Sequence, residues 1–310
     1  MELVVRTDNA GRRLDRFLFA YMNSASHSFV YKMLRKKRIK LNDKRAGGGE
    51  ILAVGDRLRF YISSDTIGGF RKEVHVDEAK PMPEIIYEDS DVLVVNKPAG
   101  LVSMGGMEGK IDHLLARLLF YLQKKGDYPP DADFTPGICN RLDVNTSGLV
   151  VCGKNLKTLQ KFNALFKDRK IAKEYAAIVD GTAGAVGETR ILRGFIEKDK
   201  KARIAKISQL KSGSSQEAIT KFTVLASGRA HSLLSVEPVT GRFHQIRAHL
   251  SSIGHPLHGD KKYGSKGGQW PLLLHCRCLT VDGGDSWEAP MPKIFEERVS
   301  ELFGVEGNDK

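Results

Sequence analysis

The chain has 310 residues, of which 41% are hydrophobic and 28% are charged, as in ordinary globular proteins with room for two domains and a sizeable core. It contains no run of about 18 apolar residues, which excludes a membrane-spanning helix. Its first residues lack the basic and apolar blocks of a secretory signal, so we expect a cytoplasmic protein that does not act at a membrane.

The formal net charge of +12 is concentrated near the N-terminus. Residues 1–62 hold 14 Lys and Arg against 6 Asp and Glu, an excess of +8, and residues 63–310 supply the remaining +4. A compact basic segment raises the local concentration of an anionic partner. Nucleic acid is the usual partner of this kind, because neutralising its phosphates releases counterions.

The basic segment is predicted to contain two helices followed by strands. Apolar residues at helical spacing from Leu14 to Tyr21 indicate the first helix, and residues 29–37 (FVYKMLRKK) indicate a short amphipathic second helix. Alternating residues at 39–42 and 54–60 are typical of strands. A row of charges is usually only a solvated face, but here no acid interrupts the basic side of the second helix. We therefore favour nucleic-acid contact through Lys32, Arg35, Lys36 and Arg38.

Three segments of this region match a known module. RLDRFL at 13–18, RIKLN at 38–42 and VGDRL at 54–58 resemble the alpha-L RNA-binding motif of a small-subunit ribosomal protein, the S-four domain. The resemblance implies RNA binding and says nothing of catalysis. We place this domain at residues 1–62 and expect a linker at 63–83, which mixes Ser, Gly, Lys and Pro without periodicity.

Residues 84–298 are predicted to form a second, larger domain, followed by a polar tail at 299–310. Helices are expected at 111–124, after the capping residue Asn155, and from Arg242 to Ile253. Strands are expected at 85–87, 92–96, 149–152, 173–179, 218–226, 231–237 and 272–281. Because strands dominate, the pattern predicts an α+β fold with a mixed, largely antiparallel sheet.

Several common motifs are incomplete in this chain. Cys276 and Cys278 lack the second half-site that structural zinc needs, so we expect reduced core thiols. The glycine-rich segment at 104–111 departs twice from a phosphate-binding loop, at Met104 and Ile111. There is no G-x-S-x-G sequence for a serine hydrolase. No metal or cofactor site is predicted.

The most informative segment is 140–151 (NRLDVNTSGLVV), where Asp143 lies in a turn that leads into an apolar strand. Such turns are ordinarily structural, because Asp and Asn form turn hydrogen bonds. A functional role requires an ionised, accessible carboxylate, which a nearby cation favours. Arg247 is the candidate cation, because it lies at the edge of the buried stripe of the predicted helix, where a guanidinium needs a paired acid.

Segments spread in order over residues 84–298 are similar to the RluA-type pseudouridine synthase family. They are 94–102 (VVNKPAGLV), 140–154, 172–179 (AKEYAAIV), 241–264, 272–276 (LLLHC) and 288–292 (EAPMP). The resemblance implies an α+β catalytic domain with a cleft across a central mixed sheet. It also implies conversion of uridine to pseudouridine in RNA without cofactor or metal. The basic module in front resembles the arrangement in members that modify large-subunit ribosomal RNA.

By this resemblance, Asp143 is the essential carboxylate and Arg247 pairs with it. Whether Asp143 attacks the anomeric carbon, adds to the base or removes a sugar proton stays open. Tyr175 is implied to stack on the uracil and to help remove the proton from its new attachment carbon. Arg141 is implied to fill the space of a flipped nucleotide, and Leu274 to pack against the target base. Without the resemblance, Tyr175 and Leu274 would be ordinary core residues.

The expected partner is therefore RNA, with ribosomal RNA favoured over transfer RNA, and a monomer is the simplest assumption. A non-catalytic RNA-binding or ribosome-assembly factor on the same scaffold is an alternative. A glycoside hydrolase using Asp143 is another, and a retaining one needs a second carboxylate at about 5–5.5 Å. Asp260 and Glu174 are the acids available in the motifs.

Overall fold

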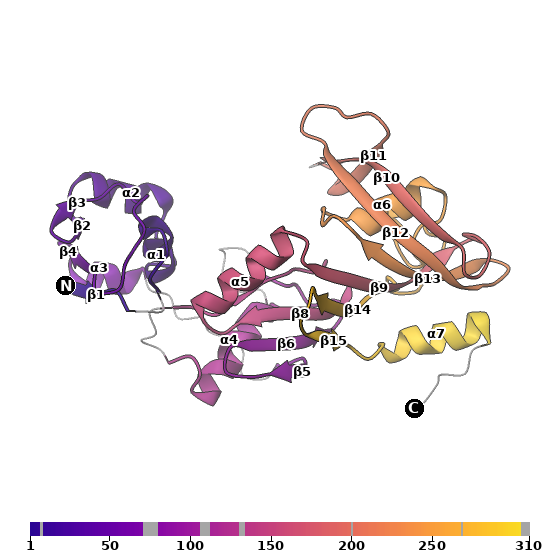
Figure 1. The fold of residues 1–310 in the computed structure, drawn as a ribbon, viewed down its shortest axis with the longest axis horizontal. Helices are drawn as coiled ribbons and strands as arrows, with labels where there is room; N and C mark the ends of the chain where they lie inside the picture. Colours follow the sequence, from indigo (N-terminus) through magenta and orange to yellow (C-terminus); the bar gives the residue numbers. More distant parts are fainter. Residues whose placement is uncertain are drawn as a thin grey trace.

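A computed structural model describes residues 1–6, 9–70, 80–105, 112–129, 134–199, 201–267 and 269–304. Their strands form two separate sheets, one of four strands near the N-terminus and one of eleven strands in the rest of the chain (Figure 1). None of the helices in these residues combines the length and the apolar character needed to cross a bilayer.

The N-terminal unit has its own hydrophobic core, formed by both of its longer helices and by its strands. Its sheet has the order β1-β4-β2-β3, and all pairs are antiparallel. The Ser26 hydroxyl accepts a hydrogen bond from the Phe29 N–H and begins α2, and Val30 and Leu34 are buried as the amphipathic pattern predicts. The elements are β1 Glu2–Val4, α1 Leu14–Tyr21, α2 His27–Arg35, β2 Ile39–Leu41, β3 Lys44–Arg45, β4 Arg57–Phe60 and α3 Ser64–Gly69.

The expected linker at 63–83 is wrong over its first residues. They form the short helix α3, which the Ser63 side chain caps, and Ile67 and Phe70 pack into the N-terminal core. Ile67 and Phe70 alone are too few to show a helical periodicity in the sequence, so α3 was not predicted. Residues 71–79 lie outside the described residues, and the large sheet begins with β5 at Glu84.

The large sheet has the order β11-β10-β12-β13-β9-β14-β8-β6-β5, with β15 paired to β14 and β7 to β8. All described pairs are antiparallel except β8 with β14, which are parallel. This confirms the predicted α+β class, although the hairpin of β10 and β11 was not predicted. The strands are β5 Glu84–Glu88, β6 Val92–Lys97, β7 Gly137–Ile138, β8 Ser147–Gly153, β9 Ile171–Asp180, β10 Thr189–Asp199, β11 Ile204–Ser208, β12 Gln216–Ser227, β13 His231–Pro238, β14 Leu274–Val281 and β15 Ser286–Glu288.

Helices cover the two halves of this sheet separately (Figure 1). Helices α4 (Leu114–Lys125) and α5 (Leu156–Lys167) pack with β6, β8 and β14, and Asn155 caps α5 as predicted. Helix α6 (Gln245–Ser252) packs on β11, β12 and β13. Helix α7 (Lys293–Phe303) packs on the opposite face of β9 from α6, because alternate residues of that strand enter different cores. The 3-10 helix η2 (Lys261–Tyr263) follows α6.

The expected polar tail at 299–310 is also partly wrong. Helix α7 continues to Phe303, and Val299, Leu302 and Phe303 pack against the core that contains Phe295. Residues 305–310 lie outside the described residues. Phe295, Val299, Leu302 and Phe303 recur at helical spacing, and this is the signal for the end of the helix, which the polar composition of the segment hid.

The two halves of the sheet meet where β8 runs parallel to β14. Gly148 lies there with a φ of 115°, and a side chain at this position would overlap the carbonyl oxygen of Cys276. Only glycine accommodates both the backbone conformation and this close approach. The turn that precedes β8 is thereby held against β9 and β14.

Candidate active site

The turn that carries Asp143 is fixed on both sides by hydrogen bonds. Asn140 bridges to β8, since its side chain donates to the Leu149 carbonyl and accepts from the Val151 N–H. The Ser103 hydroxyl donates to the Leu142 carbonyl at 2.8 Å. A turn held in this way presents the Asp143 carboxylate, whose side chain is 29% exposed, from a rigid support.

The buried side chain of Lys97 supports the same turn. Lys97, at the end of β6, is fully buried and donates to the carbonyls of Pro98, Leu101 and Val144. Burial lowers the pKa of Lys97 to about 8, and the negative charge of Asp143 opposes this shift. Its ammonium group therefore stabilises the backbone next to Asp143 and adds positive potential there.

Arg247 of α6 reaches the Asp143 carboxylate, as predicted. Its Nη1 donates to Asp143 Oδ2 at 3.3 Å, whereas its Nε and Nη2 donate to the two carboxylate oxygens of Asp260 at 2.7 and 2.9 Å. The ring of Tyr263 lies 4.9 Å from the guanidinium carbon. Burial alone would lower the pKa of Arg247, but Asp260, and then Asp143, raise it above its ordinary value.

His244, just before α6, completes the cluster around the guanidinium. Arg247 Nη1 lies 2.9 Å from its Nε2, so this nitrogen is the acceptor and Nδ1 carries the proton, 3.0 Å from the Tyr263 hydroxyl. Burial lowers the pKa of His244 to about 4, which leaves the ring neutral at pH 7. Its φ of 53° is a left-handed conformation that a side chain adopts only when the surrounding structure enforces it.

Asp143 and Arg247 lie at the wall of a cavity of about 690 Å³, within the range of ligand pockets. Tyr175 of β9, Leu274 of β14 and the exposed Arg141 line the same cavity. The structure thus brings together all five residues predicted for the catalytic region. Burial raises the pKa of Tyr175 well above its ordinary value, and Cys276 and Asp143 act in the same direction, so its phenol stays protonated.

The charge of this cavity suits a polyanion. Asp143 is the single acid among its described lining residues, whereas six Lys and Arg side chains line it: Arg141, Lys167, Arg169, Lys173, Arg242 and Arg247. The Asp260 carboxylate already pairs with Arg247. The Glu174 carboxylate accepts a hydrogen bond from the Ser235 hydroxyl and does not line the cavity. The described residues thus give Asp143 no partner carboxylate in the cavity, which argues against a retaining glycoside hydrolase.

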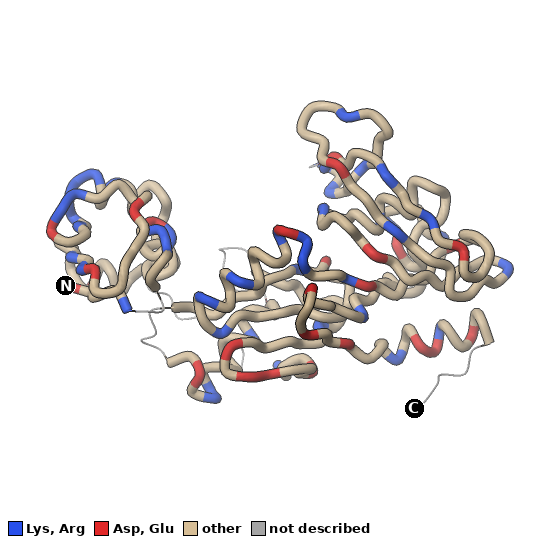
Figure 2. The backbone as a smooth tube through the Cα atoms, in the orientation of Figure 1, with Lys and Arg blue, Asp and Glu red and all other residues tan. Residues whose placement is uncertain are grey.

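The basic residues predicted in the N-terminal unit are not part of this cavity. Lys32, Arg35, Lys36 and Arg38 are exposed on α2 and at the turn after it, and none forms an ion pair with another described residue. Figure 2 shows Lys and Arg gathered along this edge of the unit. Their contact with nucleic acid stays a prediction.

Sequence reasoning missed three residues of the cluster. Asp260, rather than Asp143, is the stronger partner of Arg247, and His244 and Tyr263 support the guanidinium. The spacing of His244 and Arg247, three residues apart at the start of a predicted helix, could have indicated that they touch. Asp260 lies thirteen residues beyond Arg247, and no periodicity joins the two.

This chain is similar in sequence to several known proteins. The profile of the family described as RNA pseudouridylate synthase matches residues 91–252. Ribosomal large subunit pseudouridine synthase D of Buchnera aphidicola is 33% identical over 94% of this chain and 95% of its own length. Ribosomal large subunit pseudouridine synthase C of Rickettsia conorii is 34% identical over 93% and 96%. The chain therefore belongs to the RNA pseudouridylate synthase family.

Within that family it is of the RluA type, and it is an enzyme that forms pseudouridine in RNA, as predicted. Two solved human structures share its fold. RNA Pseudouridylate Synthase Domain Containing 4 superposes with a TM-score of 0.59 at 23% identity, covering 71% of this chain and 92% of its own. RNA Pseudouridylate Synthase Domain Containing 1 gives 0.55 at 24% identity, covering 73% and 91%.

Proposed function

We propose that the protein isomerises specific uridines of large-subunit ribosomal RNA, with Asp143 as the reacting group. The observation that carries the catalytic assignment is the position of Asp143. It is the single described acid of a cationic cavity and lies 3.3 Å from Arg247. The reaction detaches the base from the ribose and reattaches it through carbon, so the nucleotide must leave its stack and enter a pocket.

Arg247 orients the Asp143 carboxylate in this proposal. The carboxylate is then ready to attack a carbon atom or to accept a proton, and its partial exposure leaves room for the nucleoside. The neutral ring of His244 lets Arg247 approach without adding a second cation.

Tyr175 and Leu274 form the surface on which we place the uracil. An aromatic ring holds a detached base by stacking at about 1–3 kcal/mol, without requiring one hydrogen-bond pattern. The raised pKa of Tyr175 supports this stacking role more directly than proton removal, because a protonated phenol is a poor base. Arg141, exposed at the rim, is placed to occupy the space that the flipped nucleotide leaves.

The choice of ribosomal RNA is supported by the relatives, several of which are named for the large ribosomal subunit. The exposed basic residues of α2 and the resemblance of the N-terminal segment to an alpha-L module support contact with a structured RNA. We further propose that the protein acts in the cytoplasm as a monomer.

The test is chemical mapping of pseudouridine in total RNA from cells with and without the gene. We expect one or more large-subunit ribosomal RNA sites to disappear and to return when the wild-type protein is supplied. Loss of transfer RNA sites alone would correct the substrate. Unchanged RNA, together with no activity of the purified protein on transcripts, would refute the proposed function.

A further inference from the structure

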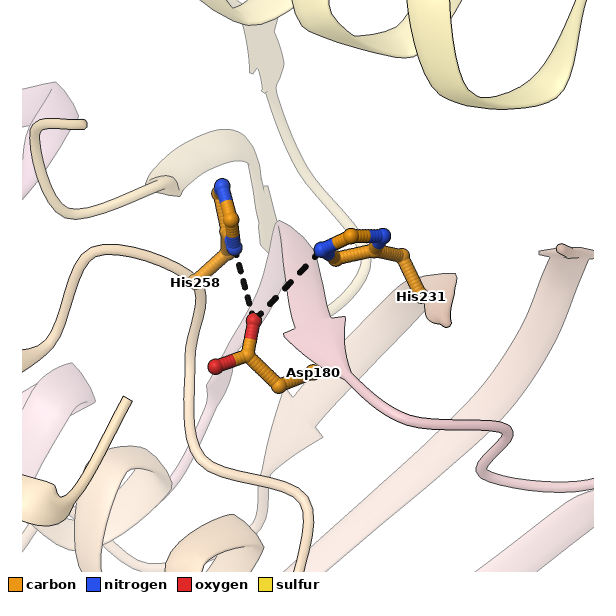
Figure 3. A group of neighbouring side chains, drawn as sticks. All are labelled: Asp180, His231 and His258. Carbon is orange, nitrogen blue, oxygen red and sulfur yellow. Dashed lines mark hydrogen bonds and ion pairs between the residues drawn. The ribbon is translucent and has the colours of Figure 1, made fainter. Parts of the chain in front are cut away.

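A cluster of two histidines and an acid lies on the face of the large sheet opposite the cavity. His258 Nδ1 is 2.7 Å from Asp180 Oδ1, and His231 Nε2 is 3.7 Å from the same oxygen (Figure 3). The three side chains are close enough to suggest a metal site. However, both ring nitrogens of His258 already have partners, because Arg298 Nη2 lies 3.3 Å from its Nε2. The positive charge of a guanidinium at this distance repels a metal ion. We therefore interpret Asp180, His231 and His258 as a structural anchor, meaning a set of side chains that fixes the neighbouring loop.

The anchor holds the loop that leads to the active site. The backbone of His258 is bonded on both sides, since its N–H donates to the Ile178 carbonyl and its carbonyl accepts from the Leu273 N–H. Ser265 joins the anchor to the next residue, because its hydroxyl donates to Asp180 Oδ2 and accepts from the Gly259 N–H. Two residues after His258, Asp260 pairs with Arg247 of α6.

Gly259 allows the turn of the chain between His258 and Asp260. Its φ is 81°, and a side chain there would overlap the Pro271 carbonyl. The loop therefore has little freedom between His258 and Asp260, and the position of one residue determines that of the other.

Asp260 controls which part of the Arg247 guanidinium faces Asp143. It occupies Nε and Nη2, the edge that pairs best with a carboxylate, and leaves Nη1 for Asp143. Asp143 is thus bonded through Oδ2, and no hydrogen bond from a described residue reaches its Oδ1. Without Asp260, the guanidinium would be free to bind both oxygens of Asp143 and leave neither for the nucleoside.

We propose that Asp260 is a positioning residue that prevents a closed, two-oxygen pair between Arg247 and Asp143, and that Asp180 and His258 hold Asp260 in place from the opposite face. This inference rests on the proposed function of Asp143. Tyr263 supports the same orientation, since its ring lies under the guanidinium.

The test compares Asp260→Asn, His258→Leu and His231→Leu with the wild type in single-turnover reactions with enzyme in excess. For Asp260→Asn we expect the rate constant to fall about 100-fold, as for a misplacement of about 1 Å, while RNA affinity stays within about twofold. For His258→Leu we expect a fall of about tenfold. His231→Leu is the matched control, because His231 belongs to the same cluster but meets the loop through an edge-to-face ring contact with His258, which a leucine can replace, and its rate constant should not change.

The dependence of the rate constant on enzyme concentration separates positioning from unfolding. A misoriented Arg247 lowers the maximal rate constant at saturating enzyme, whereas partial unfolding lowers only the concentration of competent enzyme, so it raises the total enzyme concentration needed for half-saturation and leaves the maximal rate constant unchanged. Since loss of a buried charge partner can prevent folding of Asp260→Asn, His258→Leu provides the second measurement.

A wild-type rate constant in Asp260→Asn, or equal effects of the two histidine variants, would overturn the inference. A normal maximal rate constant with a raised half-saturating enzyme concentration would also overturn it. An inactive wild-type protein would instead refute the proposed function on which the inference rests.

Discussion

Replacing Asp143 with Asn tests the centre of the proposed mechanism, because the structure predicts a large loss of activity and only a small loss of stability. At 3.3 Å and an effective dielectric constant of about 20, the attraction between Asp143 and Arg247 is about 5 kcal/mol before desolvation. Most of this is offset, because Asp143 is partly exposed and Asp260 already pairs with Arg247. We expect the free energy of unfolding to fall by about 1 kcal/mol or less.

Activity should respond far more strongly. An amide can neither attack carbon nor accept a proton as a carboxylate does, so we expect the rate of pseudouridine formation to fall at least about 10,000-fold. RNA affinity should stay within about twofold, since the remaining cavity cations and the N-terminal unit are untouched. The assay is chemical mapping of a large-subunit transcript over time, with urea unfolding and RNA titration of the same preparation. Wild-type rates in Asp143→Asn would refute the reasoning.

Three further changes test other parts of the structure. Replacing Lys32, Arg35 and Lys36 with Gln should weaken RNA binding and reduce the salt slope of log K by about 2 to 3, and an unchanged slope would show that α2 does not contact phosphate. Burial lowers the pKa of Lys97 from 10.5 to about 8, so the unfolded chain binds more protons between these values. Wild-type stability relative to Lys97→Met should therefore rise across this pH window by up to about 3 kcal/mol, and a flat difference in urea unfolding would contradict the burial argument. Asn155→Ala should cost about 1 kcal/mol in urea unfolding through loss of the α5 cap, and an unshifted midpoint would contradict it.

Much of the fold could be predicted because it depends on local patterns. Strand-like runs of residues identified β9, β12, β13 and β14, and the capping residue Asn155 identified the start of α5. The hairpin of β10 and β11 escaped, because these strands are largely exposed and carry charged residues on both faces. The helix at the start of the expected linker and the end of α7 were not predicted. Their few apolar residues pack on cores formed by residues distant in the sequence.

In the candidate site, too, local arguments predicted some contacts and missed others. Asp143 and Arg247 were paired from the cost of a buried guanidinium, a local argument that the contact at 3.3 Å bears out. The same argument could not choose between Asp143 and Asp260, because burial requires an acid but does not say which one. Which acid pairs more strongly with Arg247 depends on where the loop from His258 to Asp260 lies, and therefore on tertiary structure.

The parallel contact of β8 with β14 explains why such distant segments meet at one cavity. It places the Asp143 turn at the start of β8 beside the start of β14, so that Leu274 of β14, and Tyr175 of β9, which pairs with Cys276, line the same cavity as the carboxylate. Helix α6 belongs to the other half of the sheet and contributes Arg247 across this junction. A side chain at Gly148 would separate β8 from β14 and move Asp143 away from Arg247. The proposed reaction at Asp143 therefore depends on how closely the two halves of the sheet approach one another, which requires a glycine at position 148.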